Sequence, residues 1–390
     1  MFPTLDYLIQ YLFNIHISLP IPTLGLFIAL SFFFTYHVFV AEFKRKEALG
    51  LIHPFKSKII TGQPSSVIEL AINALIGFIV GFKITGALLN YAEVINDPKK
   101  FIFSAQGSLT GGLIGAAILA YWIYSDRKKE QLSKPVIVEE TVHPYQLMGK
   151  ITFWAGFWGV IGAKLFDGLE HFESFIYHPL IEFMSYSGYT YYGGFIFGML
   201  SFFYIGCKYG MKLAHVSDIG APGMLLAYAI GRIGCQLSGD GDWGIVNTHV
   251  KPGWLSWLPD WMWSFNFPHN VINQGVYIKG CTGDYCKVLE KGVYPTSFYE
   301  VVICSMLFLF LWLIRKHIVA AGLMSFLFLL LNGAERFFIE KIRVNPKYYA
   351  FGMHFSQAEF ISGSMMVIGI SGILYLIIKQ KINHRLLIAE

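Results

Sequence analysis

Charged residues are scarce in this chain. Only 14% of its 390 residues are Asp, Glu, Lys or Arg, whereas 55% are hydrophobic and 17% are aromatic. This composition excludes an ordinary soluble domain and a disordered chain. Several apolar runs approach or exceed the roughly 20 residues that span a bilayer as a helix, and none shows the ~10-residue alternation of an outer-membrane barrel. We therefore predict an all-α fold, a polytopic integral membrane helical bundle.

Cysteine is also rare, with five in the whole chain. Cys207, Cys235 and Cys304 lie in or beside apolar runs, where a cysteine is typically a small buried hydrophobe. Cys281 and Cys286 lie instead in a long polar loop, where a disulfide and two free thiols are the alternatives. No second pair of Cys or His accompanies them, which disfavours a metal site. We expect this protein to use no metal ion and no cofactor.

Lys and Arg are absent from residues 169–187, although three glutamates occur there. Elsewhere the basic residues gather in short clusters between apolar runs, which is typical of cytoplasmic loops and argues against a nucleic-acid surface. This pattern predicts about nine spans, with the N-terminus outside and the C-terminus in the cytoplasm. Residues 5–17 form a run too short to span, and we expect them at the membrane interface. The spans fall at roughly 20–41, 64–90, 108–124, 151–169, 189–207, 216–236, 297–314, 319–337 and 357–378.

One pattern of lysine and glycine occurs twice. Lys83 precedes a Gly-Gly pair at 111–112, Lys164 precedes another at 193–194, and the two spacings differ by one residue. A duplicated helix pair explains the match, although small-residue motifs also recur by chance wherever membrane helices pack closely. The matching runs are 77–84 with 107–115, and 157–165 with 188–198.

The chain accordingly divides into three predicted parts. Residues 1–63 hold the interfacial segment, the first span and a cytoplasmic loop, and residues 64–150 hold an extra helix pair with its loop. Residues 151–390 form the membrane core. Within the core, an exported cap at about 238–294 contains five tryptophans. Such tryptophans beside membrane spans typically lie at the headgroups, and substrate contact is the alternative.

Polar residues gather at the exported ends of the later spans in three groups. The groups are Arg232 with Asp240 and Asp242; residues 294–300, which include Tyr299 and Glu300; and residues 332–343. In the third group, polar residues spaced by four, four and three predict one helix face that points into the bundle or a water-filled cleft. The members of this face are Asn332, Arg336, Glu340 and Arg343.

Arginine is the residue that these groups share. Arg336 and Glu340 alone would make a structural pair that neutralises itself. Arg232 and Arg343 lie at about the same predicted depth, so the arginines exceed what pairing requires. Because guanidinium groups make bidentate contacts to phosphate, we predict that they bind an anionic phospholipid headgroup.

Several motifs occur in an order that resembles one known family. The run His215-Val216-Ser217-Asp218-Ile219-Gly220-Ala221-Pro222 leads into Gly231-Arg232-Ile233-Gly234 and a segment of glycines and acids. Tyr191-Tyr192-Gly193-Gly194 precedes this run, and Pro295-Thr296-Ser297-Phe298-Tyr299-Glu300 and then Gly333-Ala334-Glu335-Arg336-Phe337-Phe338-Ile339-Glu340 follow it. Together they resemble the prolipoprotein diacylglyceryl transferase family over roughly residues 150–380, with a further likeness at residues 21–26.

The resemblance implies a multi-pass enzyme of the bacterial inner membrane. Such an enzyme moves a diacylglyceryl group from phosphatidylglycerol to the lipobox cysteine thiol of a prolipoprotein, the first step of lipoprotein maturation. Its partners would be phosphatidylglycerol, the lipobox segment and membrane lipid, with no nucleic acid. By position, the resemblance implies the catalytic residues Arg232, Arg336, Glu340, Tyr192 and Asp240. The implied substrate-binding residues are Arg232, Arg343, Glu300, Tyr299, Gly193, Gly194, Cys235 and Asn332.

The chain also departs from the family pattern. Cys235 stands where the family has Asn, Tyr192 replaces its His, and Asn332 and Leu24 each replace a Tyr. One extra residue lies between Gly239 and Trp243, so either Asp240 or Asp242 takes the place of the family's acid. No histidine fills the expected place of the general base. The group that takes the thiol proton therefore stays open, with Tyr192 as a candidate.

Two other functions remain as alternatives. The first is a non-catalytic paralogue whose arginines hold an anionic lipid without reacting it. The second is a transporter built on the repeat. The two copies read as parallel and not inverted repeats, and no pair of broken helices marks a midplane site, which disfavours the transporter.

Overall fold

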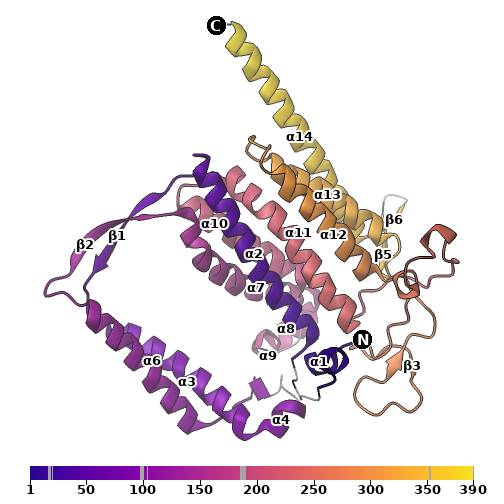
Figure 1. Ribbon diagram of the computed structural model, residues 1–390, viewed down its shortest axis with the longest axis horizontal. Helices are drawn as coiled ribbons and strands as arrows, with labels where there is room; N and C mark the ends of the chain where they lie inside the picture. Colours follow the sequence, from indigo (N-terminus) through magenta and orange to yellow (C-terminus); the bar gives the residue numbers. More distant parts are fainter. Residues whose placement is uncertain are drawn as a thin grey trace.

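Helices dominate the computed structural model, which describes residues 1–15, 19, 21–96, 101–102, 104–184, 190–350 and 353–389 (Figure 1). Within these ranges, nine helices of at least 18 residues lie where the nine spans were predicted. Five of them, α2, α3, α11, α12 and α14, are long and apolar enough to cross a membrane. The chain is therefore a polytopic helical membrane protein. The nine helices are α2 (Thr23–Ala48), α3 (Val67–Leu89), α6 (Leu109–Glu130), α7 (Met148–Glu170), α10 (Tyr191–Lys208), α11 (Leu213–Ser238), α12 (Thr296–Ile314), α13 (Leu323–Glu340) and α14 (Gln357–Ala389).

Shorter elements connect these helices. The predicted interfacial segment contains α1, and its residues 16–17 lie outside the described ranges. The short helices are α1 (Leu5–Phe13), α4 (Tyr91–Asn96), α8 (Phe172–Tyr177) and α9 (Pro179–Met184), with 3₁₀ turns at Pro144–Leu147, Gly253–Leu255 and Asp260–Met262. The strands are β1 (Phe55–Thr61), β2 (Val136–Val142), β3 (Val276–Tyr277), β4 (Lys287–Val288), β5 (Lys347–Ala350) and β6 (Met353–Ser356).

The strands form three two-stranded antiparallel ribbons, which the all-α prediction did not include. The longest pairs β1 with β2, from Phe55 opposite Val142 to Thr61 opposite Val136. Its strands are rich in Ile, Val and Thr, residues that favour a pleated surface, and they lie where plain cytoplasmic loops were expected. In Figure 1 this ribbon links α3, α4 and α6 to the rest of the chain, and those three helices stand apart from the main bundle.

Helix α11 lies at the centre of the main bundle (Figure 1). Its first half packs with α2, α7 and α10 around a buried cluster that includes Phe43, Met148 and Ile219. Its second half packs with α12 and α13 around a second buried cluster that includes Leu225, Cys304 and Met324. The polar residues at the end of α11 are therefore held between α12 and α13.

The two similar helix pairs are packed in the same way. A Cβ added at Gly81 of α3 would lie 2.2 Å from the backbone oxygen of Gly111 in α6, and one at Gly162 of α7 would lie 2.4 Å from that of Gly193 in α10. Backbones this close require glycine on both helices.

A lysine also holds the connecting loop in each pair. Lys83 donates to the backbone oxygens of Phe101, Ser104 and Gln106 at 2.7, 2.6 and 2.9 Å. Lys164 donates to the backbone oxygen of Glu182 at 3.4 Å. These shared contacts favour duplication over chance recurrence. Residues 188–189 of the second copy lie outside the described ranges.

We predict that Gly162→Val lowers the melting temperature of the detergent-solubilised protein, because the new side chain would force α7 and α10 apart. Overpacking of this kind costs about 1–3 kcal/mol. Gly156→Val on the same helix is the matched control, since a Cβ there meets nothing within 4 Å. Equal melting temperatures for the two variants would show that the glycine contact does not hold the pair together.

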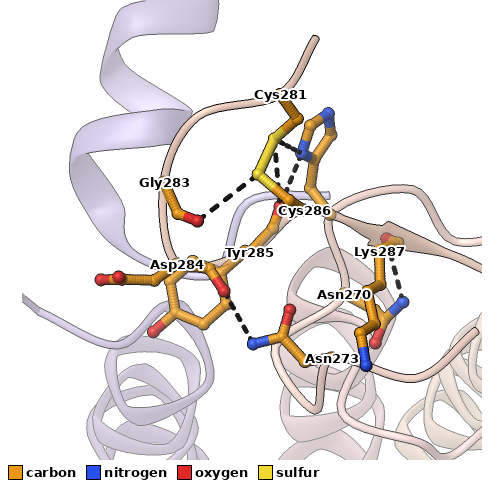
Figure 2. Close-up of a disulfide and its surroundings, with 9 residues drawn as sticks. Asn270, Asn273, Cys281, Gly283, Asp284, Tyr285, Cys286 and Lys287 are labelled. Carbon is orange, nitrogen blue, oxygen red and sulfur yellow. Dashed lines mark hydrogen bonds between the residues drawn. A yellow bond between two sulfur atoms is a disulfide. The ribbon is translucent and has the colours of Figure 1, made fainter. Parts of the chain in front are cut away.

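The cap follows α11 and has its own small core. Trp243 is only 6% exposed and packs on Phe267, whereas Trp254 and Trp257 are 75% and 76% exposed. A disulfide joins Cys281 to Cys286 beside the β3–β4 ribbon, which decides between the two alternatives for this pair (Figure 2). The exposed pair of tryptophans suits an interfacial position, while Trp243 has a packing role.

Candidate active site

A fully buried carboxylate, Glu300, is the centre of the polar cluster at the ends of α11, α12 and α13. Arg232 Nε lies 2.9 Å from Glu300 Oε2, and Arg336 Nη1 lies 3.0 Å from Oε1. Arg343 Nη1 is 3.4 Å from Oε2, and the Tyr228 hydroxyl donates to Oε1 at 2.8 Å. Glu300 therefore holds three arginines from different segments around one point.

Asp242 makes a second link between the arginines. Its two carboxylate oxygens accept from Arg232 Nη1 and from Arg343 Nη2, and its side chain is one third exposed. The turn that places it begins at Gly239, which caps α11 with φ +65°, and passes through Gly241 with φ +99°. Both angles favour glycine, so this local sequence permits the chain to turn back toward Arg232.

The pKa of Asp242 reflects these contacts. Burial alone would raise it, but Arg232 and Arg343 outweigh burial and lower the pKa below its ordinary value. Asp240 behaves in the opposite way, because burial and the charge of Asp242 raise its pKa. Of the two acids that the sequence offered in this position, Asp242 contacts the arginines, and Asp240 accepts from the Asp242 backbone N–H at 3.2 Å.

The predicted helix face is confirmed for Arg336 and Glu340, which make contacts inside the cluster. Asn332, Arg336 and Glu340 lie on α13, and Arg336 Nη2 is 3.1 Å from Glu340 Oε2. Arg343 lies beyond the helix, which ends at Glu340. There the backbone leaves the helix to pair with the segment after Asp242: Ile245 N–H donates to Ile342 O at 2.8 Å. This pairing, and not helical periodicity, brings Arg343 to Glu300.

The expectation that the arginines exceed what pairing requires is wrong for the described residues. Glu300, Asp242 and Glu340 supply as many carboxylates as there are arginines in the cluster. Asp242 and Glu300 come from other segments, so spacing along α13 did not reveal them as partners. A phosphate that binds here must therefore compete with a carboxylate.

Cys235 lies on the Asp240 side of the cluster. It is half-buried, and Arg232 Nη1 is 3.8 Å from its sulfur. The sulfur and the carboxylates of Asp240 and Asp242 lie within 4.8 Å of one another, a spacing that a metal ion could bridge. Two guanidinium groups already occupy the Asp242 carboxylate, and their charge disfavours a cation at this place.

The remaining predicted residues lie on other elements. Tyr192, Gly193 and Gly194 are in the first turn of α10, and the two glycines face α7. Tyr299 is half-buried on α12, and its hydroxyl donates to the backbone oxygen of Trp263 at 3.4 Å. It lines an apolar cavity of about 290 Å³ between the cap and α12, and Glu300 is not among the residues that line this cavity.

Two residues of the cluster, Tyr228 and Glu335, were not among the site residues predicted from the sequence. Tyr228 accepts from Arg232 Nη2 at 3.2 Å, and its ring lies under that guanidinium group. The signal was available, because Tyr228 precedes Arg232 by four residues on one helix. Glu335 is 6% exposed, and both of its carboxylate oxygens lack a hydrogen-bond partner among the described residues. The sequence could have indicated Glu335, because a carboxylate within an apolar span, directly before Arg336, suggests a functional residue.

Comparison with known proteins agrees with the motif order. Residues 131–375, more than half of the chain, match the family described as prolipoprotein diacylglyceryl transferase. The match begins after α6, so the helices α3 and α6 lie outside it.

Proteins named phosphatidylglycerol--prolipoprotein diacylglyceryl transferase are similar to this chain at modest identity. The protein of Xylella fastidiosa (strain 9a5c) is 27% identical over 224 residues, which cover 54% of this chain and 70% of the relative. That of Staphylococcus carnosus (strain TM300) is 26% identical over 268 residues, covering 68% and 84%. Since the family match spans α7, α10 and all the helices that build the arginine cluster, the chain belongs to the prolipoprotein diacylglyceryl transferase family.

Proposed function

We propose that this chain transfers the diacylglyceryl group of phosphatidylglycerol to the lipobox cysteine thiol of prolipoproteins, in the bacterial inner membrane. The names of its relatives and its family support this function. The observation that carries it is the convergence of Arg232, Arg336 and Arg343 on the buried Glu300 within the matched region. A membrane enzyme that handles a lipid phosphate needs fixed positive charge at the end of its spans.

The reaction is a displacement at a glycerol carbon. The thiolate sulfur forms a bond to that carbon, the bond from the carbon to the phosphate oxygen breaks, and glycerol phosphate leaves with the electron pair. Arg232 on α11 and Arg336 on α13 would hold the phosphate from two sides and stabilise the charge that develops on it. Glu300 and Glu340 would orient these guanidinium groups, and Arg343, which shares Asp242 with Arg232, would be a third contact to the phosphate.

The thiol proton needs an acceptor. We propose Asp240 for this role, with Tyr192 as the alternative. Burial raises the pKa of Asp240, which makes its carboxylate a stronger base than an exposed one. Loss of transfer in Asp240→Asn, with transfer retained in Tyr192→Phe, would support Asp240, and the reverse result would support Tyr192.

We further propose nine spans, with the N-terminus and the cap outside and the C-terminus in the cytoplasm. Disulfides persist in oxidising compartments, so Cys281–Cys286 supports an exported cap. The proposed parts are residues 1–63, the extra helix pair at 64–150 and the transferase core at 151–390. The ribbon would then lie on the cytoplasmic side, with β1 near the end of the first part and β2 near the end of the second.

Two exposed lysines test this topology. In cells whose outer layers have been permeabilised, a membrane-impermeant maleimide should label Lys291→Cys in the cap. It should label Lys381→Cys on α14 only after the inner membrane is broken. Both variants are made in a background without the free cysteines at 207, 235 and 304. Labelling of Lys381→Cys in unbroken cells would overturn the proposed orientation.

Rescue of a strain depleted of its own diacylglyceryl transferase tests the function in vivo. We expect growth and lipoprotein modification to return when this chain is expressed. A non-catalytic lipid-binding paralogue would fail to rescue while the purified protein still bound phosphatidylglycerol. Failure of both rescue and binding would reject the two functions together.

A further inference from the structure

Asp242 occupies the position between Arg232 and Arg343 that offers two guanidinium groups to one anion. One carboxylate oxygen accepts from each arginine. The side chains of Arg232 and Arg343 are only 13% and 7% exposed, so little guanidinium surface is left for a second anion. A phosphate can accept hydrogen bonds from both arginines only at the place where the Asp242 carboxylate now lies.

Hydrogen bonds hold the backbone of Asp242, whereas its side chain, which among the described residues only the two arginines hold, is partly open to solvent. The hydroxyls of Thr296 and Ser297 both donate to its backbone oxygen at 2.8 Å, and Gly244 N–H donates to Tyr294 O at 2.8 Å. Its side chain is one third exposed, whereas Glu300 is fully buried. Among the carboxylates on these arginines, Asp242 can therefore turn toward solvent by side-chain rotation alone.

We propose that Asp242 is a positioning residue that competes with the substrate phosphate for Arg232 and Arg343, and thereby sets the affinity of the site for phosphate groups. The inference rests on the proposed function, since it takes the phosphate of the lipid and of the released glycerol phosphate as the competing anions. When phosphate binds, the carboxylate rotates outward and leaves both guanidinium groups to the phosphate oxygens. When the carboxylate returns, it displaces the product.

The competition has a direct chemical reason. Charge-assisted hydrogen bonds from guanidinium to carboxylate and to phosphate are of similar kind, so each anion can replace the other. Arg232 and Arg343 keep Glu300 as a partner throughout, at 2.9 and 3.4 Å, so neither is left as an isolated buried charge during the exchange. The arginines thus stay in place while their outer partner changes.

The test measures binding of glycerol 1-phosphate to the full-length protein in nanodiscs, with and without phosphatidylglycerol, by calorimetry. Asp242→Asn should bind glycerol 1-phosphate roughly tenfold more tightly than the unaltered protein, because the competing charge is gone while the shape is kept. Asp240→Asn is the matched control, since it removes the same charge from the same turn without breaking a contact to either arginine. We expect less than about a threefold gain there.

Two further readouts separate competition from a merely structural role. Asp242→Asn should melt at a lower temperature than the unaltered protein, and added glycerol 1-phosphate should raise its melting temperature by more. Asp242→Glu, which restores the charge, should bring the affinity back toward that of the unaltered protein. In transfer assays, glycerol 1-phosphate should inhibit Asp242→Asn more strongly.

Equal or weaker phosphate binding by Asp242→Asn relative to Asp240→Asn would overturn the inference, whatever the transfer activity. If Asp242→Asn binds glycerol 1-phosphate more tightly but the unaltered protein transfers no diacylglyceryl group, the competition is upheld and the proposed function is rejected. Absence of glycerol 1-phosphate binding in all four proteins would overturn the competition even if transfer were observed.

Discussion

Arg232→Ala is expected to reduce diacylglyceryl transfer by roughly 100- to 1,000-fold, the usual effect of removing one group that stabilises charge in a transition state. Arg232 contacts Glu300, Asp242 and Tyr228, so it stands where α11 meets the other two arginine-bearing segments. Arg336→Ala should have an effect of the same order. The measurement is the initial rate of transfer to a lipobox peptide from phosphatidylglycerol in nanodiscs.

Arg127→Ala is the matched control for these changes. Arg127 also pairs with a glutamate, at 2.8 Å from Glu69, but its side chain is 49% exposed and lies outside the family match. Its loss should leave the rate within about twofold, since exposed ion pairs contribute little. Arg232→Lys serves as a second variant that keeps the charge, in case the alanine variant does not fold. Unchanged turnover in both Arg232→Ala and Arg336→Ala would reject the arginine assignment.

Glu300→Gln should cause the largest loss of stability. This carboxylate is fully buried and lies within 3.4 Å of all three arginines of the cluster. Breaking a buried ion pair from one side costs about 3–5 kcal/mol, because the remaining charges lose their compensation. We expect a marked fall in melting temperature in detergent, together with loss of transfer.

The control for this prediction is Glu69→Gln, which removes a carboxylate from a single arginine. Glu69 is 30% exposed, so we expect a change of less than about 1 kcal/mol. Similar melting temperatures for Glu300→Gln and Glu69→Gln would show that the buried cluster does not stabilise the fold. In that case Glu300 would have to act on the chemistry alone.

The positions of the long helices could be predicted because apolar length is a local property of the sequence. The glycine contacts between α7 and α10 were also visible, as a repeated pattern. The β1–β2 ribbon was not, because its strands are about 75 residues apart in sequence and pair through the backbone. The sequence of either strand alone does not indicate the segment with which it pairs.

In the site, too, local features could be predicted from the sequence and contacts between distant segments could not. Arg336 and Glu340 could be placed on one face from their spacing, and they do form an ion pair. The choice between Asp240 and Asp242 depended on a turn through Gly239 and Gly241 with positive φ, which the sequence permits but does not specify. Arg343 reached the cluster by backbone pairing beyond the helix end. Contacts between distant segments thus determine which acid and which arginines meet in the site, and residue spacing alone does not predict those contacts.

The most direct test of the central claim is mass spectrometry of a lipobox peptide incubated with the purified protein and phosphatidylglycerol. We predict that the peptide gains the mass of one diacylglyceryl group on its cysteine, and that glycerol phosphate is released in equal amount. A peptide in which serine replaces that cysteine should gain nothing. An unmodified cysteine peptide, with phosphatidylglycerol bound to the protein but intact, would contradict the claim.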